Sequence, residues 1–188
     1  NCKNVVVENQ ILNNACIGIQ IAFSSDITIK NNNCSNNSDH GIYLCYSNNN
    51  FILNNDCTAN NWAGIGLWWY SNNNIISNNN CLDGGIGIAL MDSNNNLISN
   101  NDYLNNLDGI YLYDSNNNII LNNNCSNNKD ESIYMGNSAN NKLSGNLMLE
   151  NGIVITGLSL NDYMHEIDES NVVNGKPVYY WKNVNGGR

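Results

Sequence analysis

Proline and positive charge are both scarce in this sequence. The 188 residues include one proline, and seven lysines and arginines stand against sixteen acidic residues, for a formal net charge of −9. A surface that binds phosphate groups needs clustered cations, so nucleic acids and anionic membrane surfaces are poor partners for this chain. The lone proline, Pro177, lies outside the repetitive part described below, where a proline would interrupt backbone ladders.

Long apolar runs and a targeting segment are also missing. No run approaches the roughly 20 apolar residues of a membrane-spanning helix, and no signal peptide begins the sequence. Residue 1 already lies inside a repeat, so we expect a processed product or a piece of something longer. Seven cysteines cannot all pair within one chain, which in a secreted protein points to a free or intermolecular thiol.

Asparagine, in contrast, makes up about a quarter of the residues and stands between regularly spaced apolar positions. Two markers recur with one period of roughly 22 to 24 residues, which indicates about seven structural repeats. The glycine marker occurs at Gly18, Gly41, Gly64, Gly87, Gly109 and Gly152, with Ser132 in the same place. The serine marker occurs at Ser24, Ser47, Ser71, Ser93, Ser115 and Ser138.

Apolar residues follow both markers at constant offsets and define three inward-facing segments in each repeat. After each glycine come two apolar residues that flank a variable one, as in Ile42 and Leu44, which predicts a short strand with one buried face. Two further rows follow each serine: Val7, Ile29, Ile52, Ile76, Ile98, Ile120 and Leu143, and then Leu12, Cys34, Cys57, Cys81, Tyr103, Cys125 and Met148.

This pattern predicts an all-β fold, a right-handed parallel β-helix of about seven coils. Each coil buries its apolar residues only by stacking on its neighbours, and the asparagines suit the corners because they tolerate left-handed backbone angles and can form amide ladders. An α-solenoid is excluded because no segment keeps a 3.6-residue spacing. We expect residues 1–157 to form the coils and residues 158–188 to form a short irregular segment that caps or links them.

Three stretches resemble a known family. The coil GIYLYDSNNNIILNNNCSNN (109–128) is similar to the repeats of NosD-like proteins, which are also described as periplasmic copper-binding. The segment HEIDESNVVNGKPVYYWKN (165–183) resembles the stretch between β-helix blocks in Asn-rich members from archaeal cell surfaces, and residues 1–10 resemble the coil that follows it. The resemblance implies one block of a tandem array, or a one-block relative, outside the cell. The sequence contains no Met-rich or His-rich tract that would support the association of this family with copper.

The cysteines divide into a row and a remainder. Cys34, Cys57, Cys81 and Cys125 share one inward position, where small buried hydrophobes are the favoured interpretation and a Cu(I) thiolate site is the alternative. Three cysteines lie off this row and are candidates for disulfides between chains: Cys2, Cys16 and Cys45, the last of which should face outward.

Aromatic residues gather at outward positions of the strands that follow the glycine marker. The predicted binding face consists of Tyr43, Tyr46, Trp68, Trp69, Tyr70, Tyr111, Tyr113 and Tyr134. Such a patch has two explanations. The structural one is ordinary strand propensity together with cover by a neighbouring molecule. The functional one is a stacking platform for sugar rings or for a protein partner.

Carboxylates that could act in catalysis are few within the coils. Asp92 and Asp114 occupy one position on adjacent coils, Asp56 and Asp102 share another, and no arginine precedes Arg188. We therefore predict no catalytic residues, no metal and no cofactor. The acidic stretch around His165 is interpreted as a solvated loop.

The sequence alone thus favours a non-enzymatic extracellular module of an archaeal cell surface, with a structural or binding role. Its expected partners are copies of itself, other surface proteins or a polysaccharide. Two alternatives stay open: a carbohydrate-active β-helix enzyme, such as a polysaccharide lyase or hydrolase, and a copper-handling protein of the NosD type.

Overall fold

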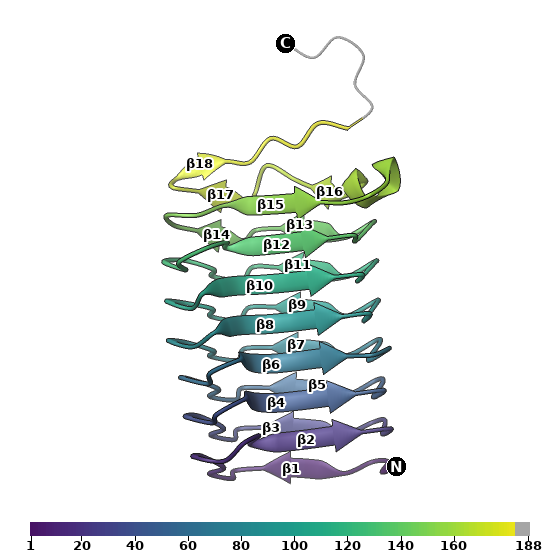
Figure 1. Cartoon of the computed structure of the whole chain (residues 1–188), viewed down its shortest axis with the longest axis vertical. Coiled ribbons are helices and arrows are strands. Elements are labelled where there is room, and N and C mark those ends of the chain that lie inside the picture. The colour runs from purple at the N-terminus through teal and green to yellow at the C-terminus, as the bar shows by residue number, and fades with distance from the viewer. Residues whose placement is uncertain (183–188) are drawn as a thin grey trace.

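The computed structural model describes residues 1–182 and shows a right-handed parallel β-helix. Its coils stack along the long axis of the molecule, with the N-terminus at one end and the C-terminal segment at the other (Figure 1). The fold predicted from the spacing of the glycine and serine markers is confirmed.

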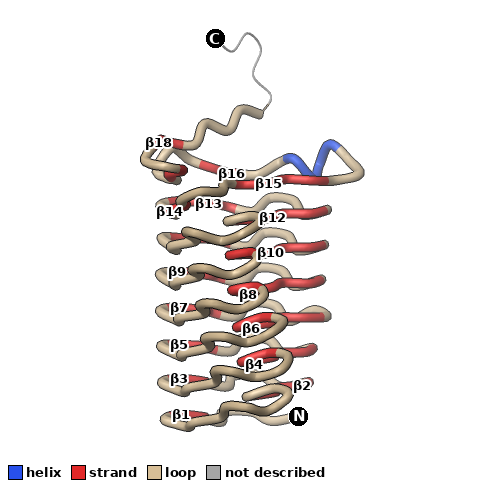
Figure 2. The backbone as a smooth tube through the Cα atoms, turned by 60° about the vertical axis from the view of Figure 1, so that its left-hand side comes forward, coloured by secondary structure: helices blue, strands red, loops and turns tan. Residues whose placement is uncertain are grey.

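Two parallel sheets run the length of the stack on different faces, joined by loops at the corners (Figure 2). The seven-stranded sheet consists of β2 (Ile19–Ala22), β4 (His40–Cys45), β6 (Ala63–Trp68), β8 (Ile86–Met91), β10 (Asp108–Tyr113), β12 (Ile133–Gly136) and β15 (Ile153–Thr156). The eight-stranded sheet consists of β1 (Val6–Glu8), β3 (Thr28–Lys30), β5 (Phe51–Leu53), β7 (Ile75–Ser77), β9 (Leu97–Ser99), β11 (Ile119–Leu121), β13 (Lys142–Ser144) and β16 (Glu166–Ile167).

The third inward segment of each coil is shorter than predicted. Most coils pair there through isolated bridges, such as Asn33 with Asp56, and not through continuous strands. The reason is local: Asn31 and Asn36 both have left-handed backbone angles, with φ of 55° and 57°, so the extended stretch between two corners is very short.

After β15 the chain continues along the C-terminal end of the stack. A 3₁₀ helix, Leu160–Tyr163, leads into β16, and the two short strands β17 (Val172–Val173) and β18 (Lys176–Pro177) join β14 (Leu147–Met148) in a small sheet. Because β16 pairs with β13 and β17 pairs with β14, residues 158–182 continue the stack with irregular connections. A separate boundary at residue 157 stays a prediction, and residues 183–188 lie outside the described part.

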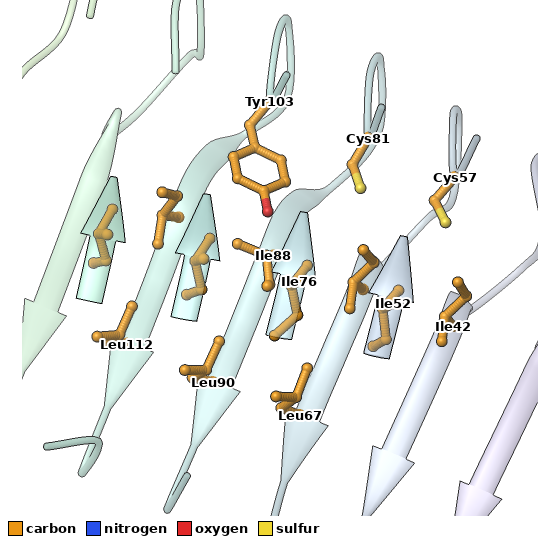
Figure 3. Packing of buried hydrophobic residues seen from close by; sticks show 14 of the residues in the cluster. Ile42, Ile52, Cys57, Leu67, Ile76, Cys81, Ile88, Leu90, Tyr103 and Leu112 are labelled. Atoms are coloured by element: carbon orange, nitrogen blue, oxygen red, sulfur yellow. The ribbon is translucent and has the colours of Figure 1, made fainter. Parts of the chain in front are cut away.

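The core is a set of stacked identical positions (Figure 3). Ile42 pairs in register with Ile65, and Ile65 with Ile88, and all three side chains are fully buried. The row that holds Cys57 and Cys81 continues into Tyr103. The predicted inward register is confirmed, and each coil depends on its neighbours for its dry environment.

Side-chain amides stack as regularly as the apolar residues. The Oδ1 atom of Asn74 accepts the backbone N–H of Asn50 at 2.8 Å and its side-chain amide at 3.0 Å, one coil earlier. Asn96 does the same for Asn74. This ladder runs through Asn50, Asn74, Asn96, Asn118 and Asn141, and a second one through Asn32, Asn55, Asn79, Asn101, Asn123, Asn146 and Asn171.

A histidine ends the first of these two ladders. The backbone N–H of Asn141 donates to Nδ1 of His165 at 3.3 Å, in the position that an asparagine oxygen holds on other coils. The Nε2 atom of His165 lies 3.0 Å from the carbonyl oxygen of Asp162 and donates to it, which leaves Nδ1 as the acceptor. The side chain is fully buried, and burial lowers the pKa of His165.

Replacing Ile110 with Asp tests the core register. The carboxylate would lie in the dry stack without a partner, so we expect a loss of about 4 kcal/mol or more in the free energy of unfolding. The matched control is Ile119→Asp, because Ile119 is 43% exposed on the eight-stranded sheet. Thermal unfolding followed by circular dichroism measures both, and equal stability of the two variants would contradict the register.

Acidification tests the histidine at the end of the ladder. The folded state binds a proton on His165 more weakly than the unfolded chain, so its contribution is complete above the ordinary pKa of 6.5 and is lost as the pH falls below that value. The variant His165→Asn supplies an amide oxygen that does not titrate. We expect its melting temperature to depend less on pH between 7 and about 5 than that of the native chain; identical pH profiles would refute this role.

Candidate functional site

The outer face of the seven-stranded sheet carries an aromatic cluster around one histidine. The ring of His40 lies 4.8 Å from Trp62, 4.9 Å from Tyr43 and 6.0 Å from Trp68, measured between centroids. Trp62 and Trp68 meet edge to face at 5.2 Å. These side chains, with Ile17 and Asp39, line a cavity of about 220 Å³ that we call the histidine pocket.

Glycine on the next coil makes room for the imidazole. A Cβ atom on Gly66 would lie 2.6 Å from Cδ2 of His40, so any larger residue there would displace the ring. The Nδ1 atom of His40 lies 3.0 Å from a carboxylate oxygen of Asp39. Burial lowers the pKa of His40, which favours the neutral imidazole, and the neighbouring Asp39 carboxylate opposes that shift.

A second group of aromatic residues lies where the same strands end. Phe23 stacks on Tyr46 at 5.0 Å with nearly parallel rings, and Tyr46 lies 6.0 Å from Trp69 and 6.1 Å from Tyr70. These rings are exposed. Tyr46, Trp69 and Tyr70 all have left-handed backbone angles, so the corner of the coil turns their side chains outward.

The remaining predicted aromatics lie farther along the stack. Tyr111 and Tyr134 stack at 4.8 Å, and the hydroxyl of Tyr113 accepts a hydrogen bond from the Asn137 amide at 3.0 Å. At the register position of Tyr111, the two intervening coils hold Gly66 and Ala89. The eight predicted residues therefore form two groups, one around β4 and β6 and one around β10 and β12, and not one continuous patch.

Three carboxylates meet beside the second group. Oxygens of Asp108, Asp130 and Glu131 lie within 4.8 Å of one another, and the backbone N–H of Glu131 donates to Asp108 at 3.1 Å. Partial burial, followed by the hydrogen bond and charge of Asp108, raises the pKa of the Glu131 carboxyl to about 7. Such a group exchanges a proton readily at neutral pH, and oxygen ligands of this kind also suit a hard cation such as Ca²⁺.

The cysteines are all free thiols, and their exposure separates them. The row Cys34, Cys57, Cys81 and Cys125 is fully buried, as predicted for small hydrophobes. Cys2 and Cys16 are exposed and stay candidates for bonds between chains. Cys45 points to the outer side but is only 8% exposed, so the expectation of an accessible thiol there is wrong. Its neighbours on the crowded aromatic face cover it.

Comparison with known families identifies the chain. Residues 63–182, more than half of the sequence, match the family described as "Periplasmic copper-binding protein (NosD)". The chain belongs to the NosD family. Residues 1–68 match the right-handed β-helix region, so both matches agree with the fold. The family description is consistent with a periplasmic or extracellular location. No curated protein matches this NosD-family chain.

Solved structures with the same fold are mostly larger enzymes. The periplasmic alginate epimerase AlgG is 29% identical over 79% of this chain and 37% of its own, with a TM-score of 0.72. The A-module of mannuronan C-5 epimerase AlgE6 from Azotobacter vinelandii is 16% identical over 89% and 57%, with a TM-score of 0.76. The Agl-KA catalytic domain is 16% identical over 89% and 41%, with a TM-score of 0.65.

These neighbours correct one expectation. The sequence favoured a module without enzymatic activity, and the similarity to epimerases and to a catalytic domain contradicts that interpretation. From the sequence, the aspartates that share positions on different coils were set aside because no arginine precedes Arg188 and lysines are sparse. The contact between Asp108 and Glu131 on adjacent coils was not foreseen. The chain spans 37% to 57% of these three structures, so their activities are not transferred whole.

Copper(I), one form of the metal that the family description implies, does not fit the buried thiols or the carboxylate set. The stacked thiols are buried among isoleucines and leucines, and burial raises the pKa of Cys34 and Cys125 far above the ordinary range. Copper(I) binds thiolates, which such an environment disfavours. Within residues 1–182, the one group of three or more His, Cys or carboxylate side chains close enough to share an ion is the carboxylate set at Glu131. Its hard oxygen atoms are poor ligands for Cu(I).

Several residues of these sites were not singled out from the sequence. His40, Asp39 and Trp62 vary from coil to coil and therefore disappear in a search for repeated positions. A usable signal exists at Gly66, where the repeat places glycine at a position held by tyrosine one coil earlier. No helix able to cross a bilayer occurs among residues 1–182.

Proposed function

We propose that this protein acts on a polysaccharide that lies along the outer face of the seven-stranded sheet. The observation that carries the proposal is the arrangement on one face. The histidine pocket on β4 and β6, the stacked Tyr111–Tyr134 pair and the Asp108–Glu131 carboxylates all point away from the core of the same sheet. Aromatic faces pack against the C–H faces of sugar rings, and the carboxylates supply proton exchange.

The spacing of the coils suits an extended glycan. Parallel strands lie about 4.8 Å apart, which is close to the length of one pyranose residue, so successive sugars would meet successive coils. Three such steps, about 14 Å, separate β4 from β10. A glycan that runs along the stack would therefore reach from the histidine pocket to Glu131.

The charge of this face favours an uncharged glycan. The strands β4, β6, β8, β10 and β12 contain no lysine or arginine, and the chain carries a net charge of −9. Alginate is a polyanion and would meet repulsion here without bridging cations. The proposed substrate class is therefore a neutral polysaccharide, which separates this chain from the epimerases that share its fold.

Glycan binding and turnover test this role. Tyr111→Ala removes one of the stacked rings, and we expect at least tenfold weaker binding of the glycan, measured by affinity electrophoresis in gels that contain neutral glucans, mannans or galactans. Phe51→Ala is the matched control, because Phe51 is 41% exposed on the other sheet.

The variant Glu131→Gln tests the catalytic part. It should still bind the glycan, but it should no longer produce new reducing ends or changed linkages in it. Native turnover should fall as the pH rises through about 7, where Glu131 loses its proton.

Two results would overturn the proposal. One is the absence of binding to every neutral glycan while alginate binds. The other is an equal loss of binding in Tyr111→Ala and Phe51→Ala, which would place the glycan elsewhere. If the native protein binds a glycan but leaves it chemically unchanged, the catalytic part of the proposal is wrong and the binding part stands.

We also propose that the protein joins copies of itself through exposed apolar residues on the coil that contains β1 and β2. Val6, Ile11 and Phe23 on this first coil are 54%, 79% and 62% exposed, and the exposed Cys16 lies on the same coil. This arrangement fits a cell-surface protein that joins its neighbours.

Introducing charged side chains on the coil that contains β1 and β2 tests the assembly. The double variant Val6→Lys/Ile11→Lys should shift the native protein from assemblies to a monomer in sedimentation velocity, because two charges would be buried at the junction. Phe51→Lys on the side of the solenoid is the control and should leave the assemblies intact. A native monomer at all concentrations, with no cross-linked species on non-reducing electrophoresis, would contradict the assembly.

A further inference from the structure

Three polar nitrogens in the histidine pocket have no hydrogen-bond partner among the described residues, and one of them, Nδ1 of His40, has the Asp39 carboxylate 3.0 Å away. The other two, the Nε2 atom of His40 and the Nε1 atom of Trp68, are both buried and accept or donate no hydrogen bond among the described residues. The His40 side chain as a whole is 4% exposed. An unpaired buried donor or acceptor is destabilising, and native proteins rarely leave two side by side. Two such groups in one cavity indicate a ligand that satisfies both.

The two nitrogens have opposite hydrogen-bonding character. The Asp39 carboxylate lies 3.0 Å from Nδ1 of His40 without hydrogen-bonding geometry, and its charge favours the tautomer with the proton on Nδ1, which leaves Nε2 as an acceptor. The indole Nε1–H of Trp68 can only donate. A hydroxyl group donates through its hydrogen and accepts through its oxygen, so hydroxyl groups satisfy both nitrogens. An ammonium group cannot accept from the indole.

The walls of the pocket restrict the chemistry of the ligand further. Trp62, Trp68 and Tyr43 surround the imidazole at centroid distances of 4.8 to 6.0 Å and present flat apolar faces. The cavity of about 220 Å³ has room for one six-membered sugar ring. Asp39 is the one ionised side chain in its lining, so an anionic sugar would be repelled.

From this geometry we infer that the histidine pocket is a subsite for one neutral pyranose residue, with its hydroxyls bonded to His40 and Trp68 and its ring against Trp62. The inference rests on the proposed function, because it names the sugar class held at one end of the glycan path. Both nitrogens are enclosed in the unliganded protein. Trp62 precedes β6 and is only partly buried, so its indole is the wall that turns aside when the sugar enters.

Nuclear magnetic resonance of the indole N–H groups tests the pocket directly. Titration with glucose, mannose, galactose and xylose, one at a time, should move the Trp68 indole signal downfield as its N–H gains an acceptor, and should move the Trp62 signal as its ring turns. The signal of Trp181, which is 60% exposed in the C-terminal segment, should stay in place. Trp68→Phe assigns the first signal and, because it keeps an aromatic wall without the donor, should weaken binding about threefold to tenfold while the fold is retained.

His40→Ala removes the acceptor and should weaken sugar binding at least tenfold, whereas Trp181→Phe should leave it unchanged. Trp68→Phe keeps the inference testable if His40→Ala does not fold. The inference is overturned if none of the four sugars moves the Trp68 signal, or if choline moves it and the sugars do not, which would make the pocket a cation cage. If a polysaccharide binds in a Tyr111-dependent way while none of the four sugars shifts the Trp68 signal, the subsite is wrong and the proposed function stands.

Discussion

The structure depends on one hydrogen bond repeated from coil to coil, in which an asparagine side-chain oxygen accepts the backbone N–H of the equivalent residue on the coil before. The bond between Asn50 N–H and Asn74 Oδ1, at 2.8 Å, is one example. Corner residues of a solenoid cannot all join regular strand ladders, and buried backbone groups need partners. The amide ladders supply those partners inside the stack, and left-handed asparagines such as Asn73 and Asn95 turn the chain beside them. This explains why a chain with so much asparagine folds without losing its apolar core.

Because the interior and the corners carry the fold, the outward positions of the seven-stranded sheet can vary without unfolding it. Tyr43, Gly66, Ala89 and Tyr111 succeed one another at one outward position while the inward residues beside them stay isoleucine and leucine. Chemical diversity on this face therefore has little structural cost. Gly66 illustrates the point, since its missing side chain admits the His40 ring and creates the pocket.

The predictability of each feature follows from whether it repeats. The inward register around Ile42 and Leu44 and the buried row through Cys57 and Cys81 were predictable because every coil restates them. The loss of the third strand was not, since it arises from backbone angles at Asn31 and Asn36 that composition alone does not determine. The cover over Cys45 and the pocket around His40 depend on side chains from neighbouring coils that occur once. The raised pKa of the Glu131 carboxyl likewise depends on its partial burial and on Asp108 one coil earlier.

Function on such a scaffold is a property of a few adjacent coils. The pocket is built by residues 39–43 and 62–68, and the carboxylate set by residues 108 and 130–131. The strands β4 and β10 that carry these two sites lie three coils apart, about 14 Å along the axis. A sugar held in the pocket would therefore place the glycan near Glu131 about three residues farther along. The three compared structures are longer chains, of which this chain spans at most 57%. A seven-coil stack is nevertheless long enough to hold one anchoring subsite and one group that exchanges protons near pH 7 on a single face.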